Sequence, residues 1–169
     1  MTERPILDIP EDIEAYFREE VIATIYNISG TEEALWGYMT IHHALEHLVM
    51  PINFTLGILP MSIFTPADEL ERNRTFLFSE YGLMRNFKFP LLPTDAPPPL
   101  MTKSLEEAKS LLVGKIEDFL NKINEPHFSD AIHPIFGVLD KAGWLQFQYK
   151  HFAHHFSQFG LPIYSKNTA

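Results

Sequence analysis

The stretch DKAGWLQFQYKHFAHHFSQFG, residues 140–160, decides the fold. Its apolar residues recur at helical spacing up to about Phe159, and Gly160-Leu161-Pro162 is a helix stop signal. A turn of about 100° per residue places five side chains on one inward face: Trp144, Gln148, His151, His155 and Gln158. The far side is expected to carry Gln146, Lys150, Ala153 and Ser157.

The inward face of this helix is polar where a bundle is usually apolar. Phe147, Phe152 and Phe159 flank the histidines, so the imidazoles are expected to lose their hydration. Each buried polar group costs about 1–3 kcal/mol unless it finds a partner. A shared metal ion would be such a partner.

A second histidine cluster, His42, His43 and His47, lies about a hundred residues upstream. We expect a helix over residues 31–50, ended by Pro51, with one stripe: Trp36, Met39, His43, His47 and Met50. Both clusters contain His-x-x-x-His, which places two imidazoles about 6 Å apart on one face. A single histidine there would be an ordinary core residue, but three or four on two helices indicate a metal site.

The donor set and the other histidines can be specified further. The chain has no cysteine, so nitrogen and oxygen must hold the ion. Zinc suits imidazole best, and nickel, iron or manganese would also accept it. His42 is expected to be exposed or to make a capping contact, and His154 to lie at the rim or beside the ligands, or to act as a spacer.

Two further amphipathic segments complete an expected all-α four-helix bundle, a single domain over residues 1–169. One starts near Pro10 and repeats Ile13, Phe17, Val21, Ile25 and Ile28 before Gly30. The other opens with a capping box at Ser104-Leu105-Glu106-Glu107 and runs to Ile123. The long crossover between the second and third helices would leave them parallel, with a short helix starting near residues 65–68.

Three features of the chain are open to two interpretations. Residues 90–99 are rich in proline and could strap the bundle or form a polyproline ligand. A second apolar stripe could be a homodimer face, or could pack on the first helix or under the strap: Leu145, Tyr149, Phe152 and Phe156. Four basic residues in the crossover could attract an anionic cosubstrate or be scattered surface charges: Arg72, Arg74, Arg85 and Lys88.

The composition narrows the kinds of molecule that the protein is expected to bind. Of 169 residues 46% are hydrophobic, which favours a packed globule. The net charge of −9 argues against nucleic acid and anionic membranes. The chain carries neither a secretory signal nor an apolar run that could span a membrane, so we expect a cytoplasmic protein.

Two stretches resemble the DinB/YfiT-like superfamily, and in particular one of its uncharacterised DinB-like domain families. Residues 36–40 with 45–48 (WGYMT, LEHL) are similar to its first motif. Residues 133–137 (HPIFG), Trp144 and residues 149–160 (YKHFAHHFSQFG) are similar to its second. With Arg4-Pro5 and residues 90–93, the resemblance covers most of the chain.

The resemblance implies a bundle with three histidine ligands, which at matching positions are His47, His151 and His155. His43 departs from the pattern, where glutamine is more usual, and could be a fourth ligand or a donor to bound water or substrate. The side chains expected around the ligands are His43, His154, Gln148, Gln158, Trp36 and Trp144.

Relatives in this superfamily include metal-dependent transferases that use low-molecular-weight thiols, and proteins labelled hydrolases. The first hypothesis is therefore a transferase that activates a small external thiol against an electrophile. The second is a hydrolase using a metal-bound hydroxide, and the third a metal-binding or interaction protein without turnover. No acid, base or nucleophile can be assigned, because Glu46 points about 100° away from His47 along the helix.

Overall fold

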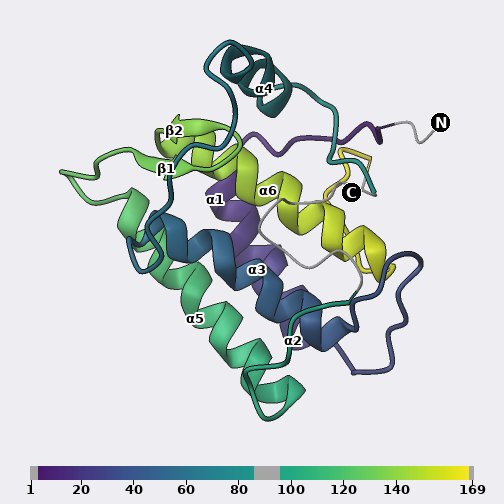
Figure 1. The fold of residues 1–169 in the computed structure, drawn as a ribbon. Helices are drawn as coiled ribbons and strands as arrows, with labels where there is room; N and C mark the ends of the chain where they lie inside the picture. The colour runs from purple at the N-terminus through teal and green to yellow at the C-terminus, as the bar shows by residue number, and fades with distance from the viewer. Residues whose placement is uncertain (1–3, 86–95, 168–169) are drawn as a thin grey trace.

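The computed structural model describes residues 4–85 and 96–167. The first helix is continuous and consists of three parts: α1 (Ile13–Tyr16), the π-helical η1 (Phe17–Val21) and α2 (Ile22–Tyr26). Counted in this way, the described residues form five helices and one β-hairpin (Figure 1). The elements that follow are α3 (Ile41–Thr55), α4 (Leu70–Leu77), α5 (Leu105–Ile123), β1 (Ala131–His133), β2 (Gly137–Leu139) and α6 (Lys141–Gln158).

The expected all-α four-helix bundle is wrong, because the described residues contain a fifth helix and a two-stranded sheet. Strands β1 and β2 pair antiparallel, with Ala131 opposite Leu139 and His133 opposite Gly137. Gly137 has a φ of 79°, which a residue with a side chain rarely adopts. Strands of three residues are too short for the period-two pattern to be seen in a sequence.

The first helix keeps the predicted apolar face and begins slightly later than predicted. Asp12 caps it by accepting a hydrogen bond from the backbone N–H of Ala15 at 2.9 Å. The predicted repeat is buried in full: Ile13, Phe17, Val21, Ile25 and Ile28. The π-helical turn η1 in its centre was not predicted.

Helix α3 differs from its prediction at both ends. It begins at Ile41 rather than near residue 31, because Thr40 caps it and Gly37 has a φ of 80°. It also continues through Pro51 to Thr55. Proline inside a helix costs about 3 kcal/mol, and the burial of Ile52 and Phe54 beyond it offsets that cost. Trp36 and Met39 therefore lie in a loop and form no helical stripe with His43 and His47.

Helices α5 and α6 match their predicted positions. The Ser104 side chain caps α5 by accepting from the N–H of Glu107 at 3.1 Å, but the Glu107 carboxylate accepts from Lys103, so the capping box is only half formed. Asp140 caps α6, and Gly160 follows it with a φ of 66°.

Helix α6 is covered on nearly every side, which corrects two expectations. Lys150 and Ala153 were expected to face outward, yet both are buried. The Lys150 ammonium donates to the carbonyls of Phe76 at 2.8 Å and Tyr81 at 2.6 Å.

The second apolar stripe of α6 packs against the first helix. The Tyr149 and Tyr16 ring centroids lie 5.7 Å apart, and those of Phe152 and Phe17 lie 5.0 Å apart. Phe156 is buried as well. Three of the four stripe residues are therefore buried within the chain, and Leu145 is half-buried.

The long connection between α3 and α5 contains α4, close to where a short helix was expected. Helices α3 and α5 lie side by side and run in the same direction, while α6 runs opposite to α3 (Figure 1). Of the expected strap at residues 90–99, residues 90–95 lie outside the described residues, as does Lys88; within residues 96–99 only Pro97 is partly buried. Among the described helices, none has both the length and the apolar character needed to cross a membrane.

Candidate metal centre

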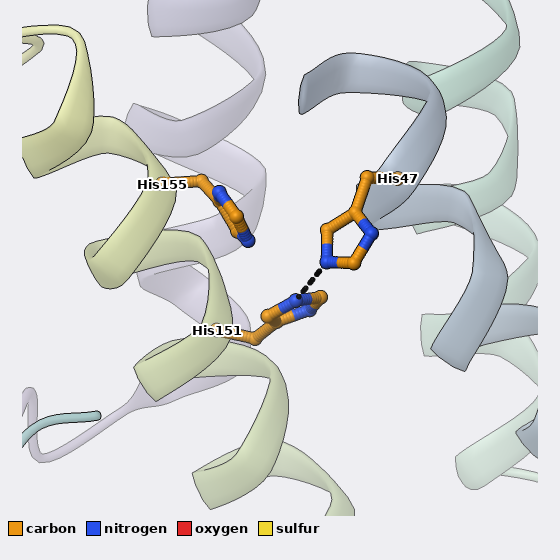
Figure 2. Close-up of side chains that lie close together, drawn as sticks. All are labelled: His47, His151 and His155. Atoms are coloured by element: carbon orange, nitrogen blue, oxygen red, sulfur yellow. Dashed lines mark hydrogen bonds between the residues drawn. The ribbon is translucent and has the colours of Figure 1, made fainter. Parts of the chain in front are cut away.

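Three imidazoles meet between α3 and α6. His47 comes from α3, and His151 and His155 lie one turn apart on α6, facing it (Figure 2). The ring centroids of His47 lie 4.9 Å from His151 and 4.7 Å from His155, and those of His151 and His155 lie 4.9 Å apart. One ring nitrogen of each histidine lies within 4.8 Å of the other two, so the cluster could hold a metal ion.

The spacing of the nitrogens suits a small divalent ion. The Nε2 atoms of His47 and His151 lie 3.0 Å apart. Two imidazole nitrogens on a tetrahedral zinc ion are about 3.3 Å apart, given Zn–N bonds of about 2.0–2.1 Å. This pair of nitrogens would therefore have to separate by only about 0.3 Å to share a zinc ion. Within the described residues the cluster contains only histidine, so its protein ligands are neutral.

Burial keeps these histidines uncharged. It lowers the pKa of His47 to about 4, with the charge of His154 adding to the effect. Burial also holds the pKa values of His151 and His155 well below their usual range, and repulsion among the clustered imidazoles acts in the same direction. Neutral imidazoles keep the nitrogen lone pairs that metal binding requires.

Gln158 orients His155. Its Oε1 lies 2.9 Å from Nδ1 of His155, while its Nε2 donates to the carbonyl of Trp36 at 2.9 Å. Because the amide nitrogen faces Trp36, the oxygen accepts from His155, which places the proton on Nδ1 and the lone pair on Nε2. A hydrogen bond to the distant nitrogen of a metal-binding histidine is a regular part of such sites.

The loop over residues 31–40 holds Gln158 in place. The N–H of Leu35 donates to the Gln158 carbonyl at 2.8 Å. A Cβ on Gly37 would lie 2.8 Å from Nε2 of Gln158, so only glycine fits this approach. Gly37 was not singled out from the sequence, although a glycine between Trp36 and Tyr38 is a loop signal.

Gln148 and His151 carry buried polar atoms without a hydrogen-bond partner in the described part of the chain. The atoms without a partner are Oε1 and Nε2 of Gln148 and Nδ1 of His151. The two residues lie one turn apart on α6, and Gln148 is fully buried. Internal water or a bound ion regularly satisfies such groups, so their position beside the cluster fits a polar site better than a plain core.

Two upstream histidines have structural roles. Nδ1 of His43 accepts from the Thr40 hydroxyl at 2.7 Å, and the same hydroxyl accepts from the His43 backbone N–H at 3.2 Å. His43 thus belongs to the N-terminal cap of α3 and is not part of the cluster. Nε2 of His42 lies 2.6 Å from the Thr102 hydroxyl, and the side chain is partly buried, so His42 is neither exposed nor a helix cap as expected.

Trp36 and His154 lie beside the cluster, whereas Trp144 belongs to the core. The His154 ring lies 4.9 Å from that of His155 and 5.9 Å from that of Trp36. Burial lowers the pKa of His154, and the nearby charge of Arg85 lowers it further. A hydrogen bond with the Leu83 backbone acts in the opposite direction and raises the pKa. Trp144 is fully buried and donates to the carbonyl of Ala131 at 3.3 Å.

Glu46 is occupied elsewhere. Its carboxylate accepts from the Met101 N–H at 2.9 Å and from the N–H and hydroxyl of Thr102 at 2.8 and 2.6 Å. Burial raises its pKa, but these hydrogen bonds outweigh burial and lower it overall. Glu46 therefore anchors the segment before α5 and does not face the histidines as a base.

In the comparison with protein families, one family model matches part of the chain. A family model described as "Protein of unknown function (DUF1569)" matches residues 93–161. The matched part includes α5, the hairpin and α6, and so His151 and His155, while His47 lies outside it. Neither the curated proteins nor the solved structures include a match to this chain.

Proposed function

We propose that this chain is a metal-dependent enzyme that transfers a small external thiol to an electrophilic small molecule. The observation that carries the proposal is the convergence of three uncharged imidazoles, His47, His151 and His155, with no carboxylate in the described cluster. The resemblance of residues 36–40 with 45–48, and of residues 133–137 with Trp144 and 149–160, to the DinB/YfiT-like superfamily supports the same conclusion.

A neutral ligand set leaves the charge of a divalent ion uncompensated, so the open position favours an anion. An ion bound there would supply a Lewis-acid position that lowers the pKa of an external thiol. Zinc is the ion that we propose, because three imidazoles suit it. The thiol must come from outside, since the chain has no cysteine.

The surroundings favour a thiol over water as the nucleophile. Hydrolysis needs an acid or base close to the reacting atoms. Glu46 is engaged by Met101 and Thr102, and the described cluster offers no other carboxylate. A thiolate needs no further base once its proton has left for solvent.

The proposed reaction is a substitution. The thiol loses its proton to solvent, sulfur donates an electron pair to the electrophilic carbon, and the leaving group departs with the electron pair of the bond that breaks. The protein holds the three imidazoles in one orientation, with Gln158 fixing His155. Phe147 stacks on His151, with ring centroids 5.3 Å apart, and excludes water from that side.

The first test is the metal content of protein purified without an affinity tag. We expect one ion per wild-type chain, and little in His151→Ala or His155→Ala. His127→Ala is the matched control, because His127 is exposed and outside the cluster. Equal metal in the wild type and His151→Ala would contradict the site.

The second test distinguishes thiol transfer from hydrolysis. Metal-loaded protein is mixed with 1-chloro-2,4-dinitrobenzene, with and without 2-mercaptoethanol, and the thioether product is measured. We expect turnover only with thiol, lost in His151→Ala and kept in His127→Ala. Release of chloride at the same rate without thiol would instead indicate a hydrolase, and no turnover under either condition would favour a metal-binding protein.

A further inference from the structure

We propose that Arg85, Trp36 and His154 form a subsite for the anionic end of the ligand whose other end lies at the three histidines. The inference deepens the proposed function and rests on it, because it names a feature of the substrate: a carboxylate or phosphate group several bonds from the sulfur. The subsite comes from three segments that are distant in sequence and meet at the cluster.

A series of close side-chain contacts leads from the cluster to a cation. The His154 ring lies 4.9 Å from that of His155, and the Trp36 ring lies 5.9 Å from His154 in an edge-to-face arrangement. The Arg85 guanidinium carbon lies 4.2 Å from the centre of the Trp36 ring. The Trp36 backbone is itself held to the cluster, because its carbonyl accepts from Gln158.

Stacking prepares the guanidinium for an anion. An arginine that lies over an aromatic face keeps its N–H groups at the edge, where a carboxylate or phosphate can accept two of them. The stack also reduces the side-chain entropy that is lost when an anion binds. Arg85 is exposed, and it has no ion-pair partner among residues 4–85 and 96–167.

The other basic residues of the crossover do not offer such a site. Arg72 pairs with Glu69 at 3.3 Å, and Arg74 lies on α4 at a surface hollow it shares with Glu71 and Phe78. The described surface has a second hollow, lined in part by Lys141 and Leu145, and neither of the two hollows is lined by a histidine of the cluster. In a chain with a net charge of −9, the Arg85 guanidinium over Trp36 gives local attraction for an anion that the rest of the surface repels.

The test compares three small thiols of similar size on the Co²⁺-loaded protein: 3-mercaptopropionate, 2-mercaptoethanol and cysteamine. The sulfur-to-cobalt charge-transfer band reports binding. We expect the wild type to bind the anionic thiol about fivefold more tightly than the neutral one, as one partly exposed ion pair allows. The cationic thiol should bind most weakly, and added salt should reduce the preference.

Arg85→Gln should remove the preference for 3-mercaptopropionate and leave the affinity for 2-mercaptoethanol unchanged. Arg72→Gln is the matched control, since it removes an exposed arginine away from the cluster, and it should keep the preference. Equal binding of all three thiols by the wild type, or a preference that survives in Arg85→Gln, would overturn the subsite.

A second measurement uses neither metal nor thiol, so that failure of the proposed function can be told from failure of the subsite. Metal-free protein labelled with ¹⁵N is titrated with propionate and, separately, inorganic phosphate. The indole resonance of Trp36, assigned from a Trp36→Phe spectrum, should shift with at least one anion in the wild type and not in Arg85→Gln. The anion that shifts it identifies the group, and no shift, or equal shifts in both proteins, would overturn the subsite. If no thiol binds the cobalt protein while this shift is present, the proposed function fails and the anion subsite stands.

Discussion

Gln158 accepts a hydrogen bond from Nδ1 of His155 at 2.9 Å and at the same time donates to the Trp36 carbonyl at 2.9 Å. One amide thus ties a candidate ligand on α6 to the loop before α3. The side chain cannot rotate without losing both bonds, so the orientation of His155 depends on the loop as well as on its own helix.

Gln158→Leu should weaken metal binding without unfolding the protein. Leucine fills a similar volume, but His155 loses the acceptor that selects its tautomer, and losses of this kind reduce metal affinity by about 10- to 100-fold. Competition with a chromophoric chelator would measure the change. Gln146→Leu is the control, because Gln146 lies on α6 outside the cluster; equal losses in both variants would show that the effect is not specific to Gln158.

Gly37→Ala should reduce both stability and metal affinity. The backbone φ of 80° costs a non-glycine residue about 1–2 kcal/mol, and the new Cβ would approach Nε2 of Gln158 at 2.8 Å. Gly57→Ala is a matched control, since its φ is 74° and nothing lies within 4 Å of the added Cβ. We expect both variants to lose stability in urea, and only Gly37→Ala to lose metal affinity. Unchanged affinity in Gly37→Ala would mean that the loop does not position the ligands.

His43→Ala should lower stability and leave metal content unchanged. The variant removes the imidazole that accepts from the Thr40 hydroxyl, and lost caps cost about 0.5–2 kcal/mol. His47→Ala, four residues along the same helix, should lose the metal. Metal content that falls as far in His43→Ala as in His47→Ala would make His43 a ligand.

The metal-free protein should become less stable as the pH falls from about 7 toward 4. Burial lowers the pKa of His47 to about 4 and that of His133 to about 3, against about 6.5 in an unfolded chain. Between these values the unfolded chain binds more protons, so the free energy of unfolding decreases with decreasing pH. The stabilisation is complete above the unfolded pKa and is lost as the pH falls toward the folded values.

Urea unfolding at several pH values measures this slope. His47→Leu removes one of the buried imidazoles, so its slope between pH 7 and 4 should be shallower. A metal ion would compete with protons for the same nitrogens, and its stabilising effect should also disappear toward low pH. Identical slopes for the wild type and His47→Leu would contradict the pKa shift of His47.

The sequence predicted best those features that a single helix determines. Asp140 and Gly160 mark the ends of α6, and a spacing of four residues puts His151 and His155 on one face whatever surrounds the helix. The structure brings these two together with His47, as expected, although their role as ligands is still a prediction. The features that were missed depend on distant segments. The loop around Gly37 is shaped by its contact with Gln158, more than a hundred residues away.

Helical periodicity gives the direction of a side chain but not what covers it. The first helix packs on one side of α6 and α3 on another, while the segment around Phe76 and Tyr81 covers the side where solvent was expected. Periodicity therefore predicts a solvent-exposed Lys150, whereas the structure buries this side chain. A lysine within a histidine-rich helix carries no signal in the sequence that distinguishes these two environments.

Lys150→Met should destabilise the protein by about 1–3 kcal/mol, because the carbonyls of Phe76 and Tyr81 lose their donor and the change leaves buried acceptors unpaired. Methionine keeps the length and apolar stem of lysine, so packing changes little. Burial and the nearby charge of Arg4 lower the pKa of Lys150 to about 8, which already limits what its charge contributes. Lys122→Met is the control, since Lys122 pairs with Glu125 at the surface, and it should change stability by less than about 0.5 kcal/mol. Equal urea midpoints for Lys150→Met and the wild type would mean that the two carbonyls find other donors and that the ammonium does not hold α4 to α6.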